Sequence, residues 1–467
     1  MRSTTLTAVV LASIAAALAL LQAPSDSDLF WHLSQGEWTL DHGGVLDKDI
    51  WSFTRDGTAY NTGAWLGDAV MAVVYRAGGW LGLDALRAVL VGVAAFFTAR
   101  VTLRVQPHAG WAALTVLASV LVSRMVWGDR PQLFTLALFP LTLDVLMSAR
   151  LEGHVRRLAI LVVVFALWAN LHNAFVIGLV AVAVFAIEGL LDGPRRTRMW
   201  PALVLVPCVL ATQLNPAGGG ALKRAAAYGA LLPGWIVEDR PLDILTGAGF
   251  VFALLLLAAI GAAMLAGREG IAKRLGAPLL WPGLIVPFSI LALAIQRETP
   301  YACMVLAPFV AAMLPTVLGR AMVRELLVPR AAAAGATLVL VALLVVELLT
   351  VAPRDPDLGA YPTGAVALLP DAKGNLLNEY DWGGYLIRYS PSHKTFIDGR
   401  GEALFLPDVL DDFQHVVALA PGYRDILKRW DIAVALLRPD RPLAGALQED
   451  GWRVLGRDAK WVLLSRP

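Results

Sequence analysis

Two aspartates around a serine come directly after the first apolar run of this sequence. Asp26 and Asp28 are followed by Leu-Phe-Trp and then by His32. Trp and Tyr can anchor a chain at the membrane surface without the desolvation cost of an acid. Carboxylates there are suited to deprotonating a hydroxyl, binding a metal or holding a cationic group. The alternative is an acidic turn that caps the next helix, because Asp and Ser are good N-cap residues.

The composition is that of an integral membrane protein. Of the 467 residues, 57% are hydrophobic and 16% are charged, and the mean hydropathy is +0.63. Soluble domains carry about a quarter charged residues. The net charge of +2 gives no reason to expect nucleic acid as a partner. Cys208 and Cys303 both lie in apolar runs, so we expect no disulfide framework.

Apolar runs predict a polytopic α-helical membrane protein with about eleven transmembrane helices. With the N-terminus in the cytoplasm, every short inner loop is basic, as the positive-inside rule requires, and the C-terminal segment is outside. The first run is then an uncleaved signal anchor, because it lacks a small-x-small cleavage site. The predicted spans are 4–23, 83–103, 109–127, 132–149, 157–171, 174–191, 200–214, 247–267, 277–296, 301–319 and 331–351.

The chain divides into two predicted domains. Residues 1–351 form the transmembrane domain, which includes a long first outer loop, 24–82. In that loop an apolar stripe from Trp65 to Val74 predicts an amphipathic helix on the membrane surface, or one packed against the outer ends of the spans.

Residues 352–467 are predicted to form a soluble extracytoplasmic α/β domain. Its Asp398-Gly399-Arg400-Gly401 segment is a turn that can also carry binding groups. The expected strands are 375–378, 394–397, 432–437, 454–456 and 461–464, and the expected helices are 406–419 and 421–429.

With this topology, polar residues gather at the outer face. Polar groups beside a span are costly and usually face a cavity, so this gathering predicts a hydrated pocket. Guanidinium groups suit a phosphate or diphosphate, and carboxylates suit a base or a divalent metal. Taken singly, Arg130 can snorkel, and Asn170 with His172 can support a broken helix pair. The clusters comprise Asp26, Asp28, His32, Arg124, Asp129, Arg130, Asn170, His172, Asn173, Glu238, Asp239, Arg240, Gln296, Arg297 and Glu298.

Several classes of protein are disfavoured because the sequence lacks their motifs. The sequence has no Walker phosphate-binding loop, no His-Glu-x-x-His zinc motif and no Gly-x-Ser-x-Gly nucleophile turn. Lipid access, a phosphate clamp and a base together indicate group transfer from a lipid phosphate.

An odd number of spans, a long first outer loop, acids after the first span and an outer α/β domain resemble the GT-C class of integral membrane glycosyltransferases. The resemblance covers nearly the whole chain. More narrowly, the chain resembles a group of bacterial members in the stretch from Asp26 to Trp65, in Arg-Pro-Gln-Leu-Phe at 130–134, Trp-Ala-Asn-Leu-His at 168–172, Asn-Pro at 215–216 and Phe-Ile-Asp-Gly-Arg at 396–400.

This resemblance implies a multi-pass protein of the bacterial cytoplasmic (inner) membrane that moves a sugar from a polyprenyl-phosphate carrier to an extracytoplasmic acceptor, which is a lipid, a glycan or a protein. In the class, a first-loop Asp is the usual base; Asp28 is the best match and Asp26 the second. We expect Arg297 and Arg130, then Arg240, to hold the donor phosphate. His32, Asn170, His172 and Glu238 complete the expected pocket.

Three points stay open at this stage. Asp26 and Glu238 are suited to orient a divalent metal, but some members of the class work without one. A carrier or flippase for lipid-linked glycans would use the same pocket without chemistry. A non-catalytic relative would act as a scaffold through its outer domain.

Overall fold

The computed structural model describes residues 2–24, 26–60, 63–218, 220, 222–223, 237–325 and 356–467. By their contacts these residues form two units, which we call the helix unit and the sheet unit. The helix unit is Met1–Gln22 with Asp84–Pro353, and the sheet unit is Ala23–Leu83 with Arg354–Pro467. The first outer loop thus packs with the C-terminal segment, whereas chain order alone had attached it to the transmembrane domain.

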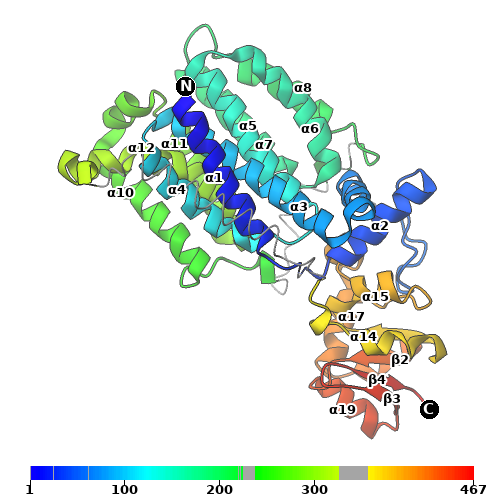
Figure 1. Ribbon diagram of the computed structural model, residues 1–467. Coiled ribbons are helices and arrows are strands. Elements are labelled where there is room, and N and C mark those ends of the chain that lie inside the picture. The colour runs from blue at the N-terminus through cyan, green and yellow to red at the C-terminus, as the bar shows by residue number, and fades with distance from the viewer. Residues whose placement is uncertain are drawn as a thin grey trace. The chain divides into compact units, whose positions relative to one another are not determined.

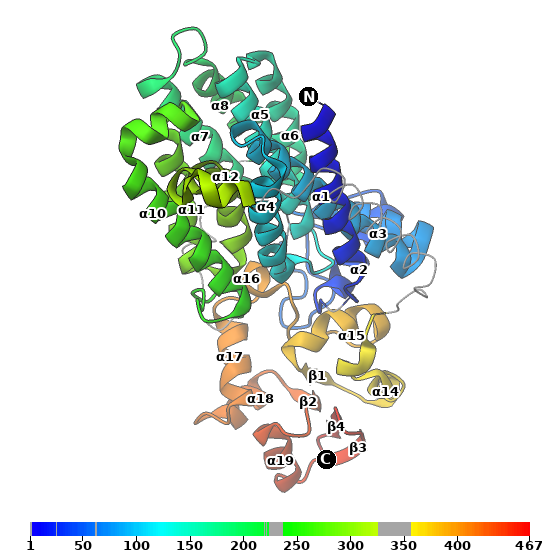
Figure 2. The ribbon, with the colours of Figure 1, turned by 60° about the vertical axis from the view of Figure 1, so that its left-hand side comes forward.

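The helix unit consists of apolar helices (Figure 1). Helix α12 packs against α10, α4 and α11, and α7 packs against α8 (Figure 2). Its core contains the fully buried side chains of Trp127, Trp168 and Trp281. The helices are α1 (Arg2–Leu20), the later part of α3 (Trp65–Val105), α4 (Ala109–Ser123), α5 (Gln132–Glu152), α6 (Ala159–Leu171), α7 (Phe175–Asp192), α8 (Trp200–Ala211), α10 (Gly247–Leu275), α11 (Leu280–Ala294) and α12 (Thr299–Glu325).

Each predicted span that the structure describes coincides with one of these helices, and the chain is a multi-pass membrane protein. In the described ranges, six helices are long and apolar enough to cross a membrane: Trp65–Val105, Ala109–Val126, Gln132–Glu152, Phe175–Asp192, Gly247–Leu275 and Gln296–Pro315. Shorter apolar helices are Thr4–Leu20, Trp200–Ala211 and Leu280–Ala294. The count of eleven spans is therefore not confirmed. The predicted span 331–351 lies outside the described residues.

The sheet unit holds a four-stranded sheet in the order β1-β2-β4-β3. Strands β1 and β2 are parallel, while β4 is antiparallel to both β2 and β3. Short helices accompany the sheet, as Figure 2 shows. The elements are α2 (Leu29–His42), α14 (Thr363–Val366), β1 (Asn375–Asn378), α15 (Gly383–Tyr389), α16 (Gly401–Leu404), α17 (Asp408–Val417), α18 (Tyr423–Arg429), β2 (Ile432–Leu437), α19 (Pro442–Glu449), β3 (Arg453–Arg457) and β4 (Val462–Ser465).

Four of the five predicted strands are present, but 394–397 is not one. Its bridge within the described residues joins Thr395 to Ser52 of the first loop. The Asn378 side chain satisfies the neighbouring backbone instead: its Oδ1 accepts from Phe396 N at 2.9 Å, and its Nδ2 donates to Ile397 O at 2.8 Å. Because a side chain and a loop take these groups, no ladder with a second strand forms.

The core of the sheet unit explains why the first loop belongs to it. Phe30 on α2 is 1% exposed and contacts Tyr361 and Tyr385, with ring centroids 5.1 and 5.4 Å apart. It lies in one buried cluster with Leu376 of β1 and Leu463 of β4. Burying an aromatic ring of this size is among the larger contributions to a small core.

The predicted amphipathic helix is the first part of α3. It begins at Trp65, and the backbone leaves helical geometry at Gly79, where φ is +57°. The predicted stripe, with Thr39, Leu40 and residues 43–45, lines an apolar groove of about 620 Å³. Val73 on this stripe remains 51% exposed. The stripe therefore faces a groove that it shares with α2 and its following loop.

Candidate active site

Asp28 stands at the start of α2 without acting as a side-chain cap. Its backbone is helical, and its carboxylate makes no capping hydrogen bond to the helix. Asp26 does support this turn, because its Oδ1 accepts from Asp28 N at 2.9 Å. The capping alternative therefore describes Asp26 better than Asp28.

His32 lies one turn along α2 and is held by an acid that the sequence did not single out. Its Nδ1 is 2.6 Å from Asp68 Oδ1 on α3, and the residues are 7% and 0% exposed. The ring also stacks on Trp31, with centroids 3.6 Å apart. One imidazole nitrogen is therefore committed to Asp68, which sets the ring orientation.

The C-terminal segment reaches the same acids. Burial raises the pKa of Tyr361, and the negative charges of Asp26 and Asp28 raise it further. The backbone of Gly399 lies directly against Asp28, since a methyl group on Gly399 would overlap the Asp28 carboxylate. The surroundings of Asp28 thus come from both ends of the chain.

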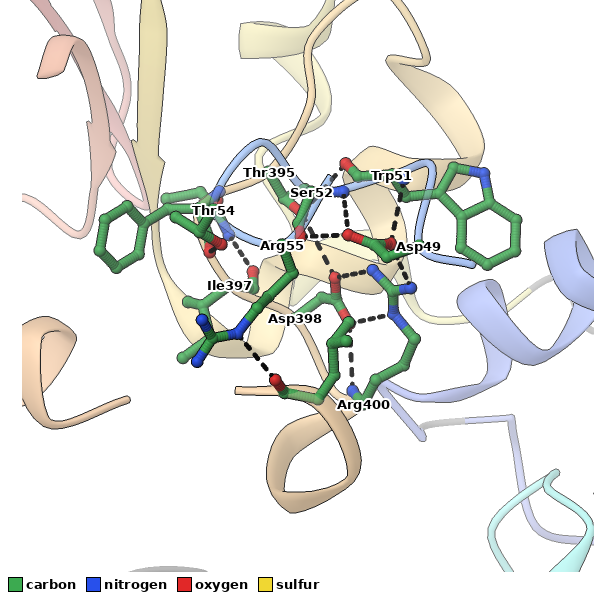
Figure 3. A network of polar contacts seen from close by, with 12 residues as sticks. Asp49, Trp51, Ser52, Thr54, Arg55, Thr395, Ile397, Asp398 and Arg400 are labelled. Atoms are coloured by element: carbon green, nitrogen blue, oxygen red, sulfur yellow. Dashed lines mark hydrogen bonds and ion pairs between the residues drawn. The ribbon is translucent and has the colours of Figure 1, made fainter. Parts of the chain in front are cut away.

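The Asp398-Gly399-Arg400 turn is fixed by a buried ion triad (Figure 3). Arg400 Nη2 is 2.7 Å from Asp398 Oδ2, and its Nη1 is 2.6 Å from Asp49 Oδ1 in the first loop. All of these side chains are 0% exposed. The ring centroids of Trp51 and Tyr60 each lie 5.1 Å from the guanidinium carbon.

The groups around Arg400 keep its guanidinium charged although it is buried. Burial acts to lower the pKa of Arg400, but the carboxylates of Asp398 and Asp49 outweigh it and raise this pKa. A cation with two carboxylates around it is electrostatically satisfied. The geometry therefore gives this turn a structural role, and the ligand-binding role that the sequence left open stays a prediction.

In the helix unit, two of the predicted phosphate-binding arginines are paired with acids. Arg130 Nη2 donates to Glu238 Oε2 at 2.5 Å, and Arg297 Nη2 is 2.9 Å from Asp239 Oδ1. The two acids lie on the short helix η3 (Val237–Asp239), and Arg297 lies on η4 (Gln296–Glu298). A backbone bond from Gln296 N to Arg240 O, 2.9 Å long, joins the two segments.

Two further arginines of the predicted cluster are exposed, Arg124 and Arg240. Arg240 has contacts of its own in addition to its backbone bond. Of the four predicted arginines, the structure thus brings Arg130, Arg240 and Arg297 to the paired segments η3 and η4.

Asn170 and His172 support the turn between α6 and α7. Asn170 Nδ2 donates to Ala166 O and Leu214 O, both at 2.7 Å. His172 Nδ1 lies 2.9 Å from Thr135 Oγ1, which also accepts from Trp168 Nε1 at 2.7 Å. These bonds satisfy polar groups at a helix break, which is the structural alternative for both residues.

Sequence reasoning missed Arg87. It is 1% exposed, its Nη2 donates to Asp84 at 2.5 Å, and it pairs with Asp129. It also donates to the carbonyls of Ala19 and Gln22 at the end of α1. Arg87 thereby ties α1 to the turn before α5. A charge inside an apolar run was the available signal.

Among the residues that the structure describes, no group of three or more His, Cys, Asp or Glu is placed to hold a metal ion. Asp26, Asp28 and His32 belong to the sheet unit, and Arg130, Glu238, Arg240 and Arg297 belong to the helix unit. The contacts described above are therefore given within each unit.

Comparison with known proteins gives the fold class. No protein-family model matches the sequence, and no curated protein does. The oligosaccharyltransferase of Archaeoglobus fulgidus, in its apo crystal structure, superposes with a TM-score of 0.58 at 11% identity, covering 93% of this chain and 69% of that one. The archaeal oligosaccharyltransferase AglB from Archaeoglobus fulgidus, with an inhibitory peptide and a dolichol-phosphate, gives a TM-score of 0.57 at 10% identity, with the same coverage.

A third structure of that enzyme, tethered to an acceptor peptide with the sequon NVT, gives 0.57 at 11% identity. At this identity the likeness concerns the fold. The chain therefore shares the fold of these oligosaccharyltransferases, which agrees with the GT-C architecture that the sequence resembles.

Proposed function

We propose that this protein is a glycosyltransferase that moves a sugar from a polyprenyl-phosphate carrier to an acceptor on the extracytoplasmic side of the membrane. The observation that carries the proposal is the likeness to oligosaccharyltransferases along 93% of the chain. One of those structures holds a dolichol-phosphate and another an acceptor peptide, so a lipid-linked donor and a separate acceptor suit this fold.

In the proposed reaction, Asp28 is the base. It takes the proton from an acceptor hydroxyl or amine, whose electron pair forms a bond to the anomeric carbon of the sugar. The bond from that carbon to the phosphate oxygen breaks, and its electron pair leaves with the polyprenyl phosphate. General-base catalysis of this kind contributes about 10²–10⁴ in rate.

Arg130 and Arg297 are proposed to stabilise the leaving phosphate, with Arg240 as a further candidate. Their guanidinium groups bind the carboxylates of two consecutive residues of η3, and carboxylates are anions as phosphate is. A forked guanidinium binds either anion through paired N–H donors. His32 and Asp26 would orient Asp28. Asp26 and Glu238, each within its own unit, stay separate candidates for orienting a metal.

We place the protein in the bacterial cytoplasmic membrane, with its N-terminus in the cytoplasm and its sheet unit outside. The basic inner loops support this orientation.

The test is release of free polyprenyl phosphate from a labelled pool of lipid-linked sugars by purified protein. Transfer would produce free carrier lipid in proportion to labelled acceptor. Intact donor recovered on the opposite leaflet of a vesicle would identify a flippase. A scaffold would give neither product. Its cellular function would be lost when residues 352–467 are removed and kept in Asp28→Asn.

A further inference from the structure

We infer that Gly399 and the buried triad of Asp49, Asp398 and Arg400 position the Asp28 carboxylate. Gly399 is then a positioning residue, and the C-terminal segment is part of the site that surrounds the proposed base. The link to catalysis rests on the proposed function. The contact between Gly399 and Asp28 is independent of it.

The contact depends on the absence of a side chain at position 399. A Cβ atom built on Gly399 would overlap the Asp28 carboxylate and would lie 2.9 Å from Trp31 Nε1. Gly399 is not among the glycines with positive φ, so its backbone conformation is open to any residue. Glycine is therefore needed here for space and not for conformation.

Two neighbouring glycines extend this surface. A Cβ atom on Gly384, at the start of α15, would lie 2.8 Å from Ser27 O and 3.2 Å from Trp31 Cδ1. A Cβ atom on Gly383 would collide with Asp398. Gly384 and Gly399 thus allow the C-terminal backbone to approach residues 27–31 closely, and Gly383 allows α15 to approach Asp398.

The triad holds this backbone in place from both sides of Gly399 (Figure 3). Asp398 and Arg400 are its direct neighbours, and Arg400 Nε donates to Asp398 Oδ1 at 2.8 Å. Asp49, from the first loop, then binds Arg400 Nη1 at 2.6 Å. Because Asp49 and Asp28 belong to the same first loop, the triad fixes the distance between that loop and Gly399.

Further bonds leave the loop little freedom. Thr395 N donates to Trp51 O at 2.9 Å, and Phe53 N donates to Thr395 O at 3.1 Å. Thr54 Oγ1 donates to Phe396 O at 2.7 Å. A shift of the Gly399 backbone would therefore displace either these bonds or the Asp28 carboxylate.

The experiment uses the full chain and a double-mutant cycle between Gly399→Ala and Asp28→Ala. We expect Gly399→Ala to lower the thermal unfolding midpoint by several degrees in the wild-type background, and by clearly less in the Asp28→Ala background, where the overlapping atoms are absent. Gly445→Ala is the matched control, because a Cβ atom there meets open space on α19. It should lower neither the midpoint nor turnover.

The second readout is the turnover rate of Gly399→Ala in the wild-type background, where Asp28 is present. We expect Gly399→Ala to lower kcat roughly a hundredfold, the scale of a misplacement of about 1 Å, with the KM for the lipid donor nearly unchanged. Equal destabilisation in both Asp28 backgrounds, or wild-type kcat in folded Gly399→Ala, would overturn the inference.

Two outcomes separate this inference from the proposed function. If the wild-type protein turns over no donor, coupling in the unfolding midpoints still supports the contact, and only the proposed function fails. If Gly399→Ala does not fold, recovery of folded protein in the Asp28→Ala double variant supports the inference. Failure of that double variant as well would overturn it.

Discussion

Arg130 donates a hydrogen bond to Glu238 across 2.5 Å, although 108 residues separate the two in sequence. The neighbouring acid, Asp239, lies 2.9 Å from Arg297 in the same way. Both arginines proposed to hold the donor phosphate therefore already bind a carboxylate. A lipid phosphate must compete with these acids or share the guanidinium groups with them, and this competition can be measured.

Replacement of Glu238 by Gln should strengthen donor binding, because a competing anion is removed from Arg130. The Glu238 side chain is 39% exposed, and a pair of this exposure is worth about 0.2–1 kcal/mol. The KM for the lipid donor should then fall by up to roughly fivefold. Activity that is instead lost and then restored by added divalent metal would contradict this and would make Glu238 a metal ligand.

Replacement of Arg297 by Ala should weaken donor use more than replacement by Lys, and Lys should not restore it fully. A planar fork grips two phosphate oxygens, whereas an ammonium group offers a point charge. The measurement is the KM for lipid-linked sugar with folded, membrane-inserted protein. Unchanged KM in Arg297→Ala would remove Arg297 from the site, and Arg130→Ala would then be tested in the same way.

Asp28→Asn should lower turnover by roughly a hundredfold or more, because an amide cannot accept the proton. Donor binding should persist, since the proposed phosphate contacts lie elsewhere. Asp26→Asn is the matched comparison and should cost less, because Asn can keep the bond that Asp26 accepts from Asp28 N. Wild-type turnover in Asp28→Asn would refute the catalytic role and favour the carrier alternative.

Arg400→Met should destabilise the sheet unit, because it leaves Asp49 and Asp398 buried without their cation. Breaking a buried pair in this way costs about 3–5 kcal/mol. The readout is the unfolding midpoint or protease resistance of the full chain. Arg466→Ala, which removes the exposed pair with Asp431, is the control and should cause no measurable change. Equal midpoints for Arg400→Met and wild type would mean that the triad contributes nothing to stability.

Reporter fusions test the orientation. A reporter fused after Arg354 should be active only outside the cytoplasm, and one fused near Arg196 only inside, because the short inner loops are basic throughout. Activity inside the cytoplasm after Arg354 would mean that the number of spans differs by one from the prediction.

Local patterns predicted much of the fold. The apolar runs predicted the helices of the helix unit, and alternation with turn residues predicted strands β1 and β2 with their exact bounds, because residues close in sequence decide these elements. The prediction of a strand at 394–397 was wrong, because the backbone bonds of this segment go to Asn378 and the first loop. Helices α2 and α19 were also missed, because short helices depend on packing more than on propensity.

The sequence by itself determined that this is an integral membrane protein and where its apolar helices lie. It also indicated the acids after the first apolar run as candidates for chemistry. Periodicity and composition act over a few residues, so a single chain displays them. Only the tertiary structure decided which charges meet. Asp49 and Arg400 are 351 residues apart, and nothing in either local pattern indicates the other. Their pairing follows from burial, because a charge removed from water must find its counter-charge wherever the fold supplies one.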